Sequence, residues 1–144
     1  MSEVDKCFEK GLLKKITKNN NLALQDIEQA EFFLNESFDL LKINKKEMAT
    51  IALYSSIFHA GRALLFQQGV KEKSHYCLQK YLEEKFVKTK ILNEEELSLF
   101  DLLRGMRQEI QYNVTKIKLE ENIEELYNKT ENFVEKIKKL LLKK

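Results

Sequence analysis

The side chains best suited to chemistry lie in one predicted helix and at two isolated histidines. The segment from Leu102 to Tyr112 carries Arg104, Arg107 and Tyr112. A guanidinium is planar and permanently charged, so either arginine could bind a phosphate through two parallel hydrogen bonds. The chain has two histidines, His59 and His75, and imidazole is the side chain that ordinarily exchanges protons near neutral pH. An arginine of this segment could therefore bind a phosphate-containing ligand, whereas the two histidines by themselves indicate no specific chemistry.

Arg107 has two interpretations. At about 100° per residue, it lies at the margin of an apolar stripe formed by Leu99, Leu103, Met106 and Ile110. A cation there must find partners because an unpaired buried charge is costly. Periodicity alone favours an internal ion pair with Asp or Glu, and a phosphate ligand is the alternative. Gly105, inside the same helix, favours close approach by another backbone or a ligand.

The histidines also have structural explanations. His59 stands among apolar residues, with Arg62 three positions later, and such histidines are mostly hydrogen-bonded core residues. His75 opens a helix, where it could meet an anion at the helix N-terminus or face solvent. We keep both as candidates for proton transfer.

The sequence predicts neither a metal site nor a cofactor. Glu72 and His75 match a Glu-x-x-His spacing once, without the second copy that a di-iron bundle needs. The four glycines are scattered, so no phosphate-binding loop can be drawn. Cys7 and Cys77 are isolated, and we expect two free thiols in the cytoplasm, with one disulfide as the alternative.

Apolar residues recur at three- and four-residue spacings, which is typical of helices. Alternating strand patterns are missing from the sequence. Proline is absent and there are four glycines. We expect an all-α fold, an antiparallel bundle of four to five helices, in a single domain over residues 1–144. Its core spans about 22–142, and an N-terminal helix over 2–16 is appended to it. The expected helices cover 2–16, 22–43, 46–68, 75–88, 94–112 and 118–142.

The helix over 46–68 is apolar or small on nearly every side, which predicts that other helices surround it. Gly61, with small neighbours, should allow one of them to approach closely. Asparagines at 19–21, Ser74 and Asn93 are expected N-caps, and Gly69 should end a helix. The apolar excess of this helix and of Leu140–Leu142 also suggests a homodimer.

Overall charge limits the partners. The chain has 25 basic and 23 acidic residues, a formal net charge of +2, which argues against sequence-specific binding of duplex DNA. The N-terminus lacks the apolar stretch of a secretory peptide. No apolar run approaches the ~20 residues needed to cross a membrane.

Two stretches together resemble the small, stand-alone HEPN proteins of archaea and bacteria. They are MATIALYSSIFHAGRALLFQQGVKEKSHYCLQKYL and FDLLRGMRQEIQYN, and the resemblance extends from about Asp26 to the C-terminus. It implies a helical bundle, commonly a homodimer, and partnership with a minimal nucleotidyltransferase, often as a toxin–antitoxin pair. Catalytic HEPN members are metal-independent ribonucleases with an Arg-x4-6-His motif. Arg107 matches its arginine, but Tyr112 stands where the histidine is expected.

Tyrosine titrates near ~10, so Tyr112 does not suit proton exchange at neutral pH. The favoured hypothesis is a non-catalytic or weakly catalytic HEPN module. It would bind a nucleotidyltransferase, or a nucleotide or RNA phosphate, through Arg104, Arg107 and Tyr112. One alternative is a metal-independent RNA-cleaving toxin in which His59 or His75 supplies the proton carrier. Another is a purely structural helical protein in which Arg107 forms an internal ion pair. By the resemblance, Tyr112 could also accept a nucleotide.

Overall fold

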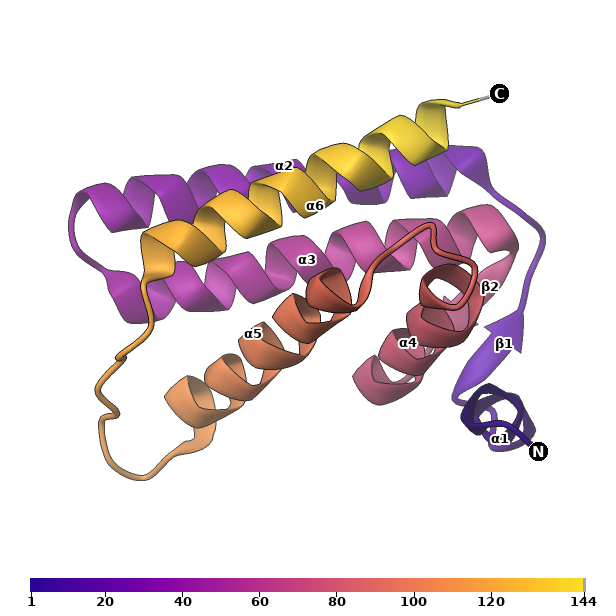
Figure 1. The fold of residues 1–144 in the computed structure, drawn as a ribbon, viewed down its shortest axis with the longest axis horizontal. Helices are drawn as coiled ribbons and strands as arrows, with labels where there is room; N and C mark the ends of the chain where they lie inside the picture. The colour runs from indigo at the N-terminus through magenta and orange to yellow at the C-terminus, as the bar shows by residue number, and fades with distance from the viewer. Residues whose placement is uncertain (144) are drawn as a thin grey trace.

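The structure is a computed structural model and describes residues 1–143. Figure 1 shows α2 (Asn20–Lys42) and α3 (Lys46–Gln68) as an antiparallel pair, with α6 (Ile123–Leu142) packed along both. On the other side of α3 lie α4 (His75–Leu82) and α5 (Glu94–Tyr112). The predicted all-α bundle is confirmed. None of the helices in residues 1–143 is both long and apolar enough to cross a membrane.

The central helix is α3, whose predicted bounds of 46–68 agree with the structure. It contacts α2, α4, α5 and α6, and most of its apolar side chains are buried. A Cβ at Gly61 would lie 3.1 Å from Leu82 Cδ1 and 3.2 Å from Phe100 Cε2, so glycine allows the close approach predicted there. Because one chain already buries most of this helix, its apolar character gives no evidence for a dimer, and the homodimer stays a prediction. Of the C-terminal leucines, Leu142 is exposed but Leu141 is buried.

The helix ends follow local side-chain chemistry. Asn19, Ser74, Asn93 and Asn122 each accept a hydrogen bond from a backbone N–H of the first turn of α2, α4, α5 and α6, respectively. Such caps satisfy donors that have no partner inside the helix. The predicted caps at Ser74 and Asn93 are confirmed, as is the helix end at Gly69, which has a left-handed φ of 75°.

The N-terminal segment differs from the prediction. A helix over 2–16 was expected, but α1 spans only Glu3–Glu9, and Gly11 adopts a φ of +73° just beyond it. A short strand follows, β1 (Leu13–Lys15), which pairs antiparallel with β2 (Val70–Glu72). A Cβ at Gly69 would lie 2.7 Å from the Ile16 carbonyl oxygen, so glycine is needed where β2 begins. The expectation that strands are absent was wrong here.

Two other helices are shorter than expected. The helix predicted over 75–88 is an α-helix only to Leu82 and continues as a π-helical turn, η1 (Glu83–Val87). The last helix begins at Ile123 instead of 118, after a loop over 113–122. The expectation of free thiols was also wrong, because Cys7 of α1 and Cys77 of α4 form a disulfide. The cysteines are separated by 70 residues in sequence, and only the packing of α1 against α4 brings them together.

Candidate functional site

Arg107 lies over an aromatic ring and forms no ion pair within residues 1–143. Its guanidinium carbon is 4.7 Å from the ring centroid of Tyr54 on α3. Its Nε is buried without a hydrogen-bond partner, although most buried polar atoms have one. The ion pair that periodicity favoured is therefore not formed by any described carboxylate. Contact with the ring face stabilises the cation but leaves hydrogen-bonding capacity for a ligand.

His75 meets the same tyrosine from another helix. The Nδ1 of His75 lies 2.5 Å from Tyr54 Oη, a hydrogen bond across 21 residues of sequence. The imidazole stacks on Phe58, with ring centroids 4.1 Å apart and planes 19° apart. Ser74 Oγ accepts a hydrogen bond from Cys77 N and so fixes the start of α4. With Nδ1 bonded to Tyr54, Nε2 is the nitrogen left for a ligand.

Burial and the nearby arginines control ionisation here. Burial lowers the pKa of His75, and Arg107, Arg104 and Arg62 lower it further by repelling the imidazolium. Burial raises the pKa of Tyr54 to about 12, although Arg107 and Arg104 oppose that change. At neutral pH the imidazole and the phenol are therefore both uncharged. The positive charge of the cluster comes from its arginines and favours an anionic ligand.

Arg104 lies on α5 about one turn before Arg107. Within residues 1–143 it forms no side-chain hydrogen bond or ion pair, and it is partly exposed. Its positive charge acts to lower the pKa of both His75 and Tyr54. We call Arg104, Arg107, Tyr54, His75 and Phe58 the arginine–histidine cluster.

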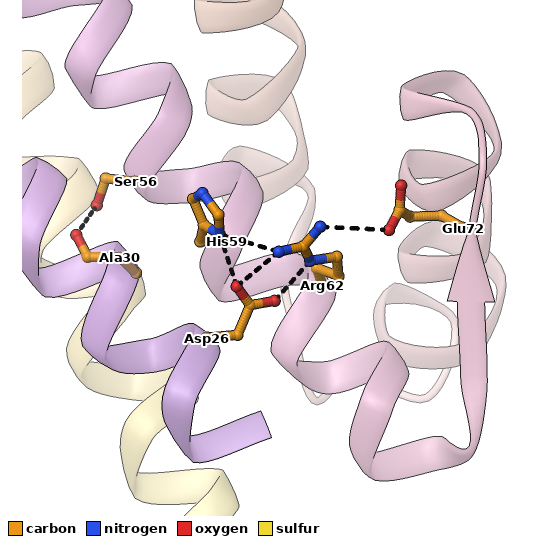
Figure 2. A network of polar contacts seen from close by, with 6 residues as sticks. All are labelled: Asp26, Ala30, Ser56, His59, Arg62 and Glu72. Atoms are coloured by element: carbon orange, nitrogen blue, oxygen red, sulfur yellow. Dashed lines mark hydrogen bonds and ion pairs between the residues drawn. The ribbon is translucent and has the colours of Figure 1, made fainter. Parts of the chain in front are cut away.

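The other histidine belongs to a polar network that is satisfied within the chain (Figure 2). Asp26 of α2 is almost completely buried. Its carboxylate accepts hydrogen bonds from Arg62 Nε at 2.7 Å and Nη2 at 3.1 Å, and its Oδ1 lies 2.6 Å from His59 Nδ1. Glu72 of β2 forms a longer ion pair with Arg62 at 3.8 Å. His59 is therefore the hydrogen-bonded residue that its apolar surroundings predicted, and it also stacks on Phe33 at 5.4 Å.

Tyr112 does not join Arg107. It is the last residue of α5, and 65% of its surface is exposed. Five residues of helix rotate a side chain by about 140° and advance it by about 7.5 Å, so Tyr112 points to a different side of α5 from Arg107. The predicted ligand group of Arg104, Arg107 and Tyr112 is thus only partly brought together. Gly105, where close approach was expected, has no atom within 4 Å of an added Cβ among the described residues.

Sequence reasoning missed Tyr54, Phe58 and Asp26 as parts of these sites. Tyr54 and Phe58 lie on the helix over 46–68, whose all-round apolar character predicts core positions and gives no hint of a site. Their spacing of four residues, which places two aromatic rings on one helix face, was the available signal. Asp26 gave no signal in the sequence, because nothing local links it to Arg62. Within residues 1–143, no group of three His, Cys, Asp or Glu side chains is arranged to hold a metal ion.

Comparison with known proteins agrees with this architecture. A family model described as HEPN domain matches residues 24–140. The chain belongs to the HEPN family. A relative from Methanocaldococcus jannaschii, named "Putative toxin MJ0142", is 31% identical over 121 residues, which cover 82% of this chain and 80% of the relative. The HEPN match includes the whole arginine–histidine cluster and the Asp26 network, but it begins after α1 and β1.

Proposed function

We propose that this HEPN protein binds RNA at the arginine–histidine cluster and cleaves it without a metal ion. The observation that carries the proposal is the state of Arg107, which has no carboxylate partner within residues 1–143 and lies beside the same tyrosine as a neutral imidazole. The histidine expected after Arg107 in the HEPN motif is missing from α5. His75, from α4, supplies an imidazole in its place.

The proposed reaction uses the 2′-hydroxyl of RNA as the nucleophile. In the tautomer with its proton on Nδ1, His75 donates to Tyr54 Oη, and the lone pair of Nε2 accepts the 2′-hydroxyl proton. The 2′-oxygen then forms a bond to phosphorus, and the bond to the 5′-oxygen breaks. The products are a 2′,3′-cyclic phosphate and a 5′-hydroxyl, whose oxygen takes a proton from water. The Arg107 and Arg104 guanidinium groups stabilise the charge that develops on the phosphate oxygens.

The name of the relative supports a toxin-like role, because cleavage of cellular RNA would be harmful to the host. The test uses purified protein, mixed RNAs and a chelator. We expect cleavage by the wild type, and loss of at least about a hundredfold in rate for Arg107→Ala and His75→Ala. Tyr112→Phe is the matched control and should cleave normally.

Absence of cleavage by the folded wild type would reject the ribonuclease proposal. Cleavage that survives both Arg107→Ala and His75→Ala would also reject it. A requirement for added divalent cation would exclude the metal-independent reaction. Mass analysis for a cyclic phosphate end identifies the chemistry.

A second candidate function is a non-catalytic module that pairs with a minimal nucleotidyltransferase. The observation in its favour is Tyr112, whose hydroxyl lies on a side chain that is 65% exposed at the end of α5. In nucleotide transfer, the phenolic oxygen would bond to the α-phosphorus of a nucleoside triphosphate. Pyrophosphate would leave, and the phenolic proton would pass to solvent.

Co-expression with such an enzyme, followed by mass spectrometry, tests this candidate. A mass gain of one nucleoside monophosphate group that is lost in Tyr112→Phe and kept in Tyr76→Phe supports it. Tyr76 is a suitable control because it is also exposed. An unmodified wild-type chain that does not co-purify with the enzyme would reject it. The HEPN resemblance also leads us to propose a homodimer, and light scattering at micromolar concentration measures it directly.

A further inference from the structure

The β1–β2 ribbon carries lysines on one face. Lys14 of β1 is paired directly opposite Lys71 of β2. Lys73 follows the end of β2, and its backbone N–H donates to the carbonyl of Leu12, which directly precedes β1, so Lys73 lies close to Lys14. All three side chains are exposed. Contact with Lys14, together with repulsion from Lys14 and Lys71, lowers the pKa of Lys73. Like charges directly opposite on neighbouring strands are destabilising, so this face favours an anion.

A groove adjoins this lysine face. Its volume is about 880 Å³, and its lining includes Lys71, Arg62, Gln25, Gln29 and Phe32. Phe32 is 53% exposed although it is a large aromatic residue. The acids in the groove are Asp26, which is already bound by Arg62 and His59, and Glu28. Arg62 is paired with Asp26 and Glu72, so the cation that the groove offers to a ligand is Lys71, beside two amide groups and an open aromatic face.

Arg62 connects the groove to the arginine–histidine cluster. Its guanidinium carbon is 5.5 Å from the ring centroid of Phe58, and Phe58 stacks on His75. An RNA strand bound at His75 can therefore continue past Arg62 to Lys71. Lys73 precedes His75 by two residues, which places the ribbon within a few nucleotides of the cluster.

We propose that the lysine face of the ribbon (Lys14, Lys71 and Lys73) and the adjoining groove bind the backbone and one base of single-stranded RNA beyond the cleavage site. This inference rests on the proposed function. Proteins that bind single-stranded nucleic acid combine a positively charged path for phosphates with aromatic rings on which bases stack. Here the lysines contact phosphates and Phe32 stacks on a base. Lys14 and β1 lie before the segment that matches the HEPN model, so the N-terminal extension contributes to RNA binding.

The test measures binding of 2′-O-methyl RNA, which cannot be cleaved through its 2′-oxygen, by fluorescence anisotropy. An oligomer of about 4 nucleotides reaches only the arginine–histidine cluster, whereas one of about 16 nucleotides also reaches the lysine face and the groove. The test variant is K14Q/K71Q/K73Q. The matched control, K46Q/K116Q/K118Q, removes the same charge at a small hollow near the start of α3.

For the test variant we expect at least about a tenfold loss of affinity for the long RNA and little change for the short one. The slope of log affinity against log salt should decrease by about 2, because three phosphate contacts are lost from a single strand. The control variant should change affinity by less than about twofold. Phe32→Ala should weaken binding of the long RNA by about tenfold and leave the salt slope unchanged.

Equal affinity of the test and control variants for the long RNA would overturn this inference, even if the short 2′-O-methyl RNA is still bound and unmodified RNA of the same length is still cleaved. Long RNA bound no more tightly than short RNA by the wild type would also overturn it. If the wild type neither binds the short 2′-O-methyl RNA nor cleaves unmodified RNA of the same length, the proposed function itself fails. Circular dichroism melting of each variant verifies that loss of binding does not reflect loss of folding.

Discussion

Arg62 and Arg107 both lower the pKa of His75 through their charge, but their surroundings differ. Arg62 donates two hydrogen bonds to the buried carboxylate of Asp26, and it pairs more loosely with Glu72. Arg107 has an aromatic ring beneath it and a buried Nε without a partner in the described chain. Breaking a buried charge pair costs several kcal/mol, so Arg62 is held by the fold. The comparison shows that carboxylate partners distinguish a structural arginine from one available to a ligand.

The largest expected effect comes from exchanging each arginine for alanine. Arg107→Ala should lower the rate of RNA cleavage by about 10²–10³, because a group that stabilises the transition state is lost. Its free energy of unfolding should change by no more than about 1 kcal/mol, the strength of a cation–π contact. Arg62→Ala should show the reverse, a loss of about 2–3 kcal/mol in stability with a smaller effect on cleavage.

Urea unfolding and a cleavage assay on the same preparations measure both quantities. An Arg107→Ala protein that is destabilised as strongly as Arg62→Ala would remove the distinction between the two arginines. Arg107→Lys refines the result, since lysine keeps the charge but loses the planar pair of donors.

The next largest effect concerns Asp26. Asp26→Asn removes the carboxylate that Arg62 and His59 share and should lower the free energy of unfolding by about 2–3 kcal/mol. The Arg62 side chain is 29% exposed, so solvent relieves part of the cost. Asp39→Asn is the matched control, because Asp39 is exposed and pairs with Lys42 at 3.9 Å; it should change stability by less than about 0.5 kcal/mol. Equal effects in urea unfolding would show that the network is not structural.

A smaller effect is expected from Tyr54→Phe, which removes the hydrogen bond to His75 Nδ1. The cleavage rate should fall by about tenfold, because the imidazole is no longer oriented. In the wild type, burial lowers the pKa of His75 from 6.5. A base acts when unprotonated, so the rate should rise with pH through this lowered pKa and then become constant. A rate that decreases between about pH 5 and about pH 7 would instead identify protonated His75 as an acid.

The smallest effect concerns the two helical glycines. Gly105→Ala should stabilise the protein by about 0.5–1 kcal/mol, because alanine favours the helix and nothing in the described chain lies within 4 Å of the added Cβ. Gly61→Ala should destabilise it by about 1 kcal/mol, because Leu82 and Phe100 must move. Thermal unfolding measures both. A destabilised Gly105→Ala that also loses dimer mass would show that a second copy covers this part of α5.

Several features of the fold could be predicted from local sequence. The bounds of α3, the Ser74 and Asn93 caps and the end at Gly69 all follow from interactions within a few residues. Strands of three residues give too weak a pattern to detect, so β1 and β2 were missed. Gly11 is visible in the sequence, but the pattern around it did not predict that α1 ends there.

The same reasoning identified only part of the candidate site. The sequence by itself determined the helical fold, the burial of most of α3 and the candidacy of Arg107, because helical periodicity and capping depend on neighbouring residues. Only the tertiary structure decided that His75 meets Tyr54 over 21 residues, that Arg62 reaches Asp26 over 36, and that Cys7 joins Cys77 over 70. These contacts depend on how whole helices pack, and the identity of one residue does not specify a distant partner. For that reason the sequence could name Arg107 but could not show whether a carboxylate neutralises it.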